Sequence, residues 1–417
     1  MPSGLVSPNP WMILPFLLLL GTIAFAPLVA PDWWRKNYAG AALIPGAVTL
    51  AYYLLGLHAA DHVLHTGAEY VRFIVLIGSL FVVSGGIHIT VRGGAAPRAN
   101  VVFLLAGAVL ANLLGTTGAS MLLIRPWLRM NRGRVAAHHV VFFIFIVANV
   151  GGCLTPVGDP PLFLGYLNGI PFWWVAENCW PMWALAMGLL LAMFYAVDSA
   201  SFRRAAPDAR ETGGEAWRFE GLGNLFFLAV ILGAVFLGRP PFLREALMLG
   251  AAAGSFLTTK KSVHAANDFN FHPLREVAVL FAGIFATMIP ALDWLQLHAG
   301  QFGPPTPGTL YWSCGALSAG LDNAPAYLSF LSALTGATHA GSVAHLLAAC
   351  PRNVAAIGVA AVFFGAATYI GNGPNFMVKT IAAQQQARGP GFAGYIGRFT
   401  LPFLLPALAA VWLAFFR

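Results

Sequence analysis

Charged side chains are scarce in this chain. Asp, Glu, Lys and Arg make up only 9% of its 417 residues, against about 25% in an average soluble domain. A soluble fold of this size needs far more charge to cover its surface. The scarcity excludes a soluble enzyme, a disordered scaffold and a nucleic-acid-binding protein, so no nucleic acid is expected among the partners.

Cysteine is also rare. The four cysteines, Cys153, Cys179, Cys314 and Cys350, are widely separated and show neither metal-ligand spacing nor a disulfide framework. Neither a nucleotide-binding loop nor an H-E-x-x-H run occurs. The sequence therefore predicts no cofactor and no enzyme activity. An intramembrane enzyme and a passive channel remain open as alternatives.

Apolar residues are abundant instead. They form 58% of the chain, mean hydropathy is +0.73, and a bilayer core roughly 30 Å thick needs about 20 apolar residues per helix. The lipid bilayer is thus an expected partner, and the fold class is an all-α polytopic membrane protein. Spans are predicted near residues 11–31, 39–57, 71–91, 136–170, 178–197, 222–238, 243–259, 274–297, 353–386 and 395–416.

Two further apolar stretches, 101–128 and 309–335, are interrupted by small and polar residues. The breaks are Gly115-Thr116-Thr117-Gly118 and Gly320-Leu-Asp-Asn-Ala-Pro325. Lipid cannot satisfy the backbone groups that such a break frees, so protein or water must surround it. Both stretches are therefore predicted to be re-entrant hairpins, which leaves about ten crossings.

Basic residues set the expected orientation. With this layout, 18 of the 23 Lys and Arg residues lie on one side, which the positive-inside rule assigns to the cytoplasm. Both termini are then external, and the protein is a multi-pass protein of the cell inner (plasma) membrane. The polar segment 198–221 is expected to be a cytoplasmic linker, with residues 300–307 outside.

The two halves of the chain share a motif. Thr155-Pro-Val-Gly158-Asp159-Pro-Pro161-Leu-Phe163 aligns with Thr368-Tyr-Ile-Gly371-Asn372-Gly-Pro374-Asn-Phe376 as T-x-x-G-(D/N)-x-P-x-F. Residues 1–197 and 222–417 are therefore predicted to be inverted repeats. Each has a hairpin followed by a broken helix, 136–170 or 353–386. Matched Gly/Pro-interrupted helices of this kind point to a secondary-transporter binding site.

The breaks carry the chemistry of the predicted site. Asp159 and Asp322 lie in the breaks, where a carboxylate costs roughly 2.5–3.5 kcal/mol on membrane-insertion scales. Each could exchange a proton for a metal cation, or instead only cap a helix N-terminus. Side-chain oxygens of Thr155, Thr368, Asn372 and Asn375 are the hard ligands that sodium requires.

Several histidines are candidates for other sites. The run from His58 to Glu69 suits either an outer metal or pH-sensing site or an interfacial helix. His138 and His139 are expected at the interface. His88 suits either a proton path or a hydrogen-bonded core position.

Gly151-Gly-Cys-Leu-Thr-Pro-Val-Gly-Asp-Pro-Pro-Leu-Phe-Leu-Gly165 and Gly115-Thr-Thr-Gly-Ala-Ser-Met-Leu-Leu-Ile-Arg-Pro126 resemble the ion transporter superfamily. This group includes arsenite permeases, NhaD-type sodium:proton antiporters and citrate carriers, and the chain is most similar to its citrate transport or sodium:proton antiporter branch. The resemblance implies elevator-type alternating access and a homodimer. The dicarboxylate carriers use Ser-Asn-Thr hairpin tips, whereas this chain has Thr116, Thr117 and Ser120 at one tip and Asp322-Asn323 at the other.

These residues favour a sodium/proton antiporter, because the second hairpin and break supply acidic and amide groups but no Arg. The alternative is a cation-coupled citrate or dicarboxylate transporter, so the substrate is a small ion or a small organic anion. Sodium is expected as the transported or coupling ion, with Asp159 and Asp322 as its ligands. The predicted binding residues are Thr116, Thr117, Ser120, Thr155, Gly158, Asp159, Asp322, Asn323, Thr368, Asn372 and Asn375.

Overall fold

A computed structural model describes residues 6–92, 96–204, 216–237, 240, 242–302, 305–340, 342–387 and 389–417. The described chain is almost entirely helical, and its core is a continuous apolar cluster that runs through both halves. Seven of its helices are long and apolar enough to cross a membrane, or eight if the bent pair Val343–Ala349 and Pro351–Gly365 counts as one. The predicted fold class, an all-α polytopic membrane protein, is confirmed.

The helices of the first half are α1 (Leu14–Val29), α2 (Pro31–Ala51), α3 (Ala60–Gly85), α4 (Pro97–Met130), α5 (Ala137–Ile146), α6 (Pro160–Leu167) and α7 (Trp174–Arg204). Those of the second half are α9 (Asn224–Val235), α10 (Leu243–Thr258), α11 (Lys261–Ala266), α12 (His272–His298), α13 (Pro307–Gly320), α14 (Asn323–Ala337), α15 (Val343–Ala349), α16 (Pro351–Gly365), α17 (Gly373–Gln384), α18 (Phe392–Tyr395) and α19 (Leu405–Val411). Short helical turns at Pro10–Ile13, Tyr52–Gly56, Val150–Gly152, Ala299–Phe302, Ile396–Leu404 and Trp412–Phe416 extend or connect them. Two strands, β1 (His88–Arg92) and β2 (Ala216–Glu220), complete the described elements.

Helix α4 is long enough to cross a membrane, but it folds back on itself. Gly115, at its middle, has φ 73° and ψ 156°, a conformation that glycine adopts without steric cost. The Asn100 amide near one end donates to the Asn131 side chain beyond the other end at 2.8 Å. A straight helix would separate two residues 31 positions apart by about 46 Å, so the two legs of α4 lie side by side.

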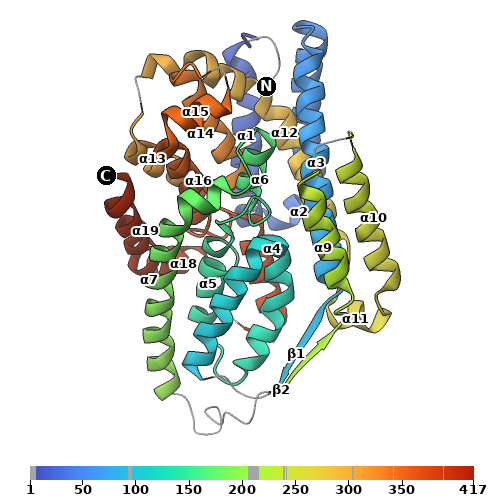
Figure 1. Cartoon of the computed structure of the whole chain (residues 1–417), viewed down its shortest axis with the longest axis vertical. Coiled ribbons are helices and arrows are strands. Elements are labelled where there is room, and N and C mark those ends of the chain that lie inside the picture. Colours follow the sequence, from blue (N-terminus) through green and yellow to red (C-terminus); the bar gives the residue numbers. More distant parts are fainter. Residues whose placement is uncertain are drawn as a thin grey trace.

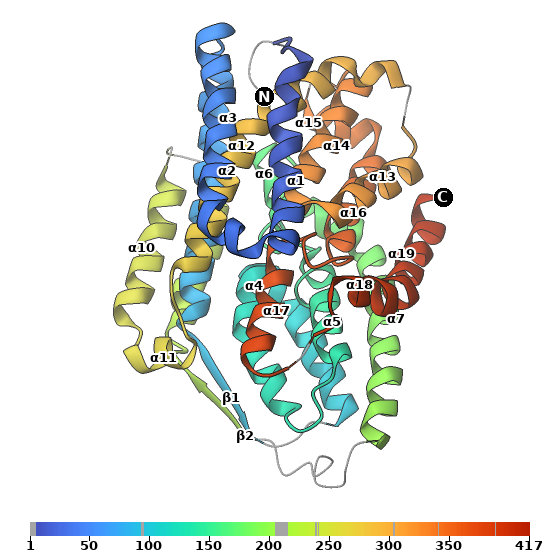
Figure 2. The same ribbon diagram turned by 180° about the vertical axis from the view of Figure 1, so that it is seen from behind.

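Helices α13 and α14 also follow each other closely in the chain, with Leu321 and Asp322 between them, and pack against each other. Figure 1 shows α4 in the lower part of the molecule and α13 and α14 in the upper part, with α6 between them. Helices α3, α9, α10 and α11 lie at one side of the molecule in Figure 1, and α3 packs against α4 and α12. Figure 2 shows α17 beside α4, and these two helices are in contact.

Some predicted boundaries were wrong. The span predicted at 71–91 ends at Gly85, and β1 follows it and pairs antiparallel with β2, with His88 opposite Glu220. The predicted linker 198–221 therefore contains the end of α7 and a strand, and its residues 205–215 lie outside the described part of the chain. Residues 303 and 304, which belong to the predicted outer loop 300–307, are likewise not among the described residues.

The predicted span at 222–238 is short. Helix α9 has only 12 residues, which corresponds to about 18 Å of helix, and α10 has 16. Helix α9 ends at Val235, where Phe236 is the C-cap and its N–H bonds back to the carbonyls of Gly233 and Ala234.

Candidate functional site

The two chain breaks are built in the same way. Between α5 and α6, the Thr155 hydroxyl donates to the Asn112 carbonyl of α4 at 2.6 Å and accepts from the Gly158 N–H. Between α16 and α17, the Thr368 hydroxyl donates to the Ala319 carbonyl of α13 at 2.7 Å and accepts from the Gly371 N–H. The threonines of the shared motif thus bond the first break to α4, just before its turn, and the second break to α13, just before the turn that leads to α14.

The glycines of the motif allow close backbone contact. A Cβ atom on Gly158 would lie 2.1 Å from the Gly152 carbonyl oxygen, and one on Gly371 would lie 2.6 Å from that of Gly365. Both distances are far inside van der Waals contact. Gly158, predicted as a site residue, therefore shapes the break through its backbone rather than through a side chain.

The proline two residues after Asp159, and the one two residues after Asn372, affect the hydrogen bonds that these two side chains can make. Asp159 and Asn372 occupy the N-cap positions of α6 and α17, yet neither side chain makes a capping hydrogen bond. An N-cap side chain normally accepts from the N–H of the second or third helical residue. Pro161 and Pro374 occupy the second position and have no N–H, and the third-position N–H groups, those of Leu162 and Asn375, bond to the backbone carbonyls of Asp159 and Asn372 instead. Both polar side chains are thereby free to make other contacts.

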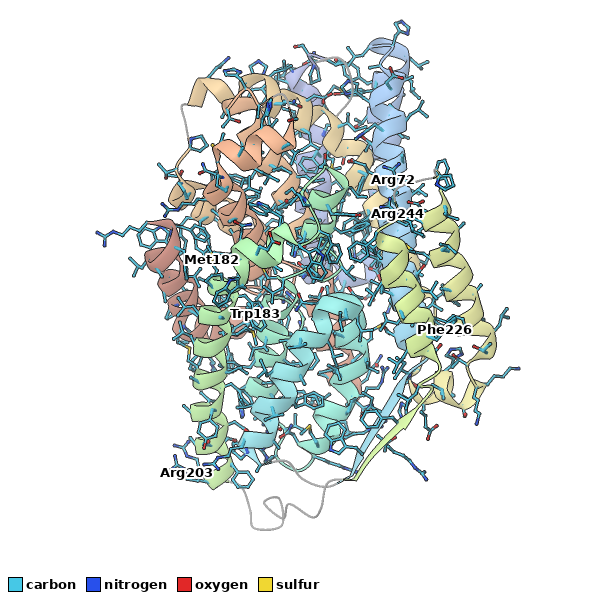
Figure 3. All side chains as sticks on the ribbon, viewed as in Figure 1. Arg72, Met182, Trp183, Arg203, Phe226 and Arg244 are labelled. Atoms are coloured by element: carbon cyan, nitrogen blue, oxygen red, sulfur yellow. The ribbon has the colours of Figure 1, made fainter. Side chains whose placement is uncertain are left out.

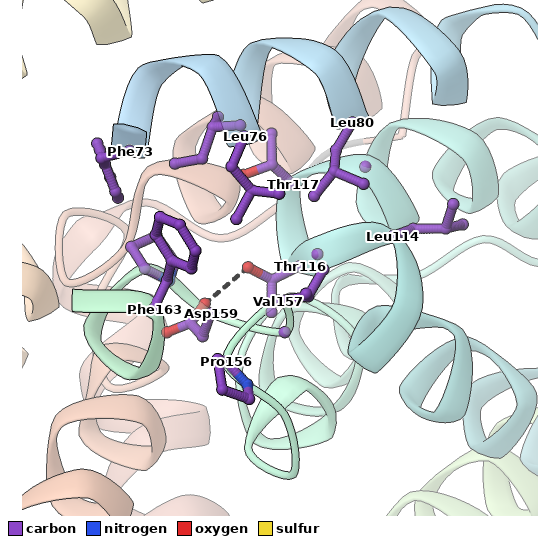
Figure 4. Close-up of a pocket in the computed structure, with 15 residues that line it drawn as sticks. Phe73, Leu76, Leu80, Leu114, Thr116, Thr117, Pro156, Val157, Asp159 and Phe163 are labelled. Atoms are coloured by element: carbon purple, nitrogen blue, oxygen red, sulfur yellow. Dashed lines mark hydrogen bonds between the residues drawn. The ribbon is translucent and has the colours of Figure 1, made fainter. Parts of the chain in front are cut away.

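These released side chains meet at the centre of the molecule. The Asp159 carboxylate is 1% exposed and accepts from the Thr116 hydroxyl at 2.7 Å, the Asn372 amide at 3.0 Å and the Asn323 amide at 2.5 Å. Figure 4 shows Thr116 and Asp159 pointing toward each other. Both turns and both breaks therefore contribute one group to a single carboxylate cluster, which we call the Asp159 cluster.

A second layer of amides supports the Asp159 cluster. The Asn372 amide also donates to the Asn149 side-chain oxygen at 3.1 Å, and the Asn149 amide donates to Asn375 at 2.7 Å. The Asn375 amide donates to the carbonyls of Gly365 and Thr368. Asn375 thus holds the second break in shape and does not touch Asp159. Asn149 was missed, although a lone amide in the apolar run before the first break is a readable signal.

The remaining predicted residues lie around this cluster. Asp322 is the N-cap of α14, and its side chain accepts from the Ala324 N–H at 3.1 Å. Thr117 lines a cavity beside Asp159. Ser120 is buried in the second leg of α4, and its hydroxyl has no hydrogen-bond partner among the described residues.

The Asp159 cluster has no basic member. Within the described part of the chain, none of the groups that donate to the carboxylate is Lys, Arg or His. The N-termini of α6, α14 and α17 begin within one residue of the cluster, and their dipoles partly offset a negative charge. A proton or a bound metal cation can supply the rest.

One polar atom of the cluster has no partner. The Asn323 side-chain oxygen is buried and unpaired among the described residues, while the amide nitrogen of the same group holds Asp159. An unsatisfied buried acceptor costs roughly 1–3 kcal/mol. Beside a carboxylate, such an oxygen is suited to a cation.

A narrow cavity of about 20 Å³ adjoins the cluster, which is roughly the space of one water molecule. Its walls come from α3, from the turn of α4 and from the first break, and include Phe73, Leu80, Thr116, Asp159 and Phe163. In this conformation the cavity admits a water molecule or a small cation but not a tricarboxylate.

The candidate histidines make specific contacts. His138 and His139 are buried within the protein, and both ring Nε2 atoms lie within 3.1 Å of the fully buried Asp198 carboxylate.

These three residues are also the one group of the described chain with metal-compatible spacing. However, the Arg134 guanidinium binds the same Asp198 oxygen. The His139 Nδ1 atom accepts from the Ala136 N–H, so its Nε2 atom carries the proton and donates. The cluster therefore joins α5 and α7 as a buried ion pair with no free ligand atom.

The outer histidines do not form one site either. His62 pairs with Asp293 at 3.1 Å, and His65 lies 3.9 Å from Glu69. His88 lies on β1, where its Nδ1 atom is 2.7 Å from the Asn267 side chain. The His88 contact favours the hydrogen-bonded core position.

Comparison with curated proteins finds no match. A comparison with protein families matches residues 6–416, nearly the whole chain, to the family described as "Putative citrate transport". This match agrees with the resemblance to the citrate branch of the ion transporter superfamily. With the helical membrane architecture and the matched breaks, it leads to one conclusion: the chain belongs to this citrate transport family.

Proposed function

We propose that this chain is a secondary active transporter that exchanges protons for sodium ions at Asp159. The observation that carries the proposal is the Asn323 oxygen, unpaired among the described residues, beside a buried carboxylate that has no basic partner among them. Carboxylate, hydroxyl and amide oxygens are the ligands that hard cations prefer. Rotation of the Asn323 side-chain amide exchanges the positions of its N–H groups and its oxygen. Asn323 can therefore donate to the Asp159 carboxylate when no cation is bound, or offer its oxygen to a cation bound beside Asp159.

Asp322 has a different role in this proposal. Its carboxylate caps α14 and fixes the turn that carries Asn323, so it positions a ligand rather than binding the cation. Thr116 and Asn372 supply the other contacts to Asp159. Proton and sodium then compete for one carboxylate, which is the requirement for exchange at a single site.

The proposed mechanism is elevator-type alternating access in a homodimer. The cavity beside Asp159 lies between α3 and the elements that carry the cluster. Movement of the α4–α6 and α13–α17 group along α3 would carry the cluster from one side of the membrane to the other. We place the linker end in the cytoplasm and both termini outside, in the inner membrane, because most basic residues then lie inside.

A second candidate is cation-coupled uptake of citrate. The family match favours it, and so do the helix N-termini around the cluster, which also suit an organic carboxylate. In that case the cation at Asp159 would be the coupling ion, and a more open conformation would admit the anion.

Flux in proteoliposomes separates the two candidates. A pH-sensitive dye trapped inside should report proton movement when sodium or lithium is added to vesicles without citrate. Potassium and empty vesicles are the controls. If no alkali cation moves protons, and labelled citrate enters only in the presence of sodium, the exchange proposal is wrong and citrate uptake takes its place.

A further inference from the structure

A second, larger cavity lies away from the Asp159 cluster. It has a volume of about 360 Å³ and is bounded by α3, by the end of α6 and by the start of α10, with Arg72, Tyr166, Gly169, Arg244 and Glu245 in its lining. Small-molecule sites commonly have volumes of about 300–1,000 Å³. Figure 3 shows Arg72 and Arg244 close together, far from Arg203 at the end of α7.

The charges in this cavity are unbalanced. The Arg244 guanidinium lies 2.9 and 3.0 Å from one Glu245 oxygen, through two of its nitrogens. Arg72 Nε is 3.9 Å from that oxygen, which is too far for a hydrogen bond. Two guanidinium groups thus face one carboxylate, and Arg72 makes no hydrogen bond within the described part of the chain.

The nearest other acidic group does not satisfy Arg72. Glu69 lies one turn away on α3, but its carboxylate accepts from the Asn168 amide at 3.1 Å and does not line the cavity. The Arg72 side chain is 38% exposed, and the paired N–H groups of a planar guanidinium match the geometry of a carboxylate.

Residues of α3 and α6 lie between this cavity and the Asp159 cluster. On α3, Arg72 lines this cavity while the next residue, Phe73, lines the cavity beside Asp159. On α6, Tyr166 lines this cavity while Phe163 lines the other, and their ring centres are 6.1 Å apart. The eight residues of α6, about 12 Å of helix, connect the two.

We propose that the cavity at Arg72 and Arg244 binds a small di- or tricarboxylate anion, as a site separate from the Asp159 cluster. Arg72 contributes a guanidinium that makes no hydrogen bond among the described residues, and Glu245 holds Arg244 in place beside it. This inference goes beyond cation exchange at Asp159 and does not depend on it.

Equilibrium binding of citrate to the purified full-length protein in detergent tests the proposal without requiring transport. Isothermal titration calorimetry should show a citrate dissociation constant at least about tenfold higher in Arg72→Gln than in the wild type. The increase should be smaller in Arg72→Lys, which keeps the positive charge but loses the paired N–H groups of the guanidinium. Arg35→Gln is the matched control, because Arg35 is a mostly exposed surface residue paired with Asp32, and it should bind like the wild type.

A second measurement covers the case in which Arg72→Gln fails to fold. Leu237 lines the cavity and is 38% exposed. In a Cys350→Ser background, citrate should slow thiol labelling of Leu237→Cys several-fold. The proposal is overturned if the wild type does not bind citrate, if Arg72→Gln binds it equally well, if affinity depends on Thr116 and not on Arg72, or if citrate leaves the labelling rate unchanged.

Discussion

At the residue scale, the position of proline decides which aspartate is available to a ligand. Asp159 is followed by two prolines, so the second-position N–H that could bond to its carboxylate is missing, and the Leu162 N–H bonds to the Asp159 backbone carbonyl. Asp322 is followed by Asn323 and Ala324, and the Ala324 N–H captures it. The sequence predicts both aspartates as candidate ligands, because both are acidic groups within a break. The different spacing of proline after Asp159 and after Asp322 nevertheless distinguishes them.

Substitutions at Asp322 should therefore behave as cap substitutions. Asp322→Asn should leave the free energy of unfolding nearly unchanged, since Asn caps as well as Asp, whereas Asp322→Ala should lower it by about 1 kcal/mol. Unfolding of the purified protein in detergent measures both. Sodium-dependent proton movement should persist in Asp322→Asn, and its loss would restore Asp322 as a cation ligand.

At the element scale, small residues shape the breaks. Gly158 and Gly371 occupy equivalent places, and each lies against the carbonyl of a glycine six residues earlier. This equivalence could be anticipated from the shared motif. The β1–β2 pair could not, because His88–Arg92 directly follows an apolar run and its partner strand lies in the other half of the chain.

Alanine substitutions should reveal the close contacts. Gly158→Ala and Gly371→Ala should each destabilise the protein by about 1–3 kcal/mol, since the new methyl group meets backbone that cannot move aside. Gly373→Ala is the matched control, because the added Cβ would meet no atom of the described residues within 4 Å beyond its chain neighbours and its own helix backbone. Thermal unfolding in detergent gives the comparison, and equal midpoints for all three variants would contradict the packing described for the breaks.

The fold of α4 predicts a labelling pattern. Arg98 and Arg132 are exposed residues near its two ends, which the Asn100–Asn131 contact brings together. Single variants Arg98→Cys and Arg132→Cys should therefore react with a membrane-impermeant thiol reagent from the same side of the membrane, which we expect to be the cytoplasm. Reaction from opposite sides would mean that α4 crosses the bilayer and would overturn the proposed orientation.

At the scale of the whole molecule, the central cluster combines groups from both halves. The fold class and most of the long helices could be predicted, because apolar runs and basic loops are local features of the sequence. The partnership of Thr116, Asn323 and Asn372 around Asp159 depends on how the halves dock. For the same reason Asn149 and the buried Asp198 cluster were missed, since their partners lie far away in the chain.

The central claim is that a proton and a sodium ion compete for Asp159. Sodium affinity of the purified protein, measured by isothermal titration calorimetry at several pH values, tests it most directly. If one proton leaves for each sodium bound, affinity should rise about tenfold per pH unit until the carboxyl group is fully ionised, and Asp159→Asn should abolish this dependence together with tight binding. Sodium affinity that does not change with pH, or that survives in Asp159→Asn, would contradict the account.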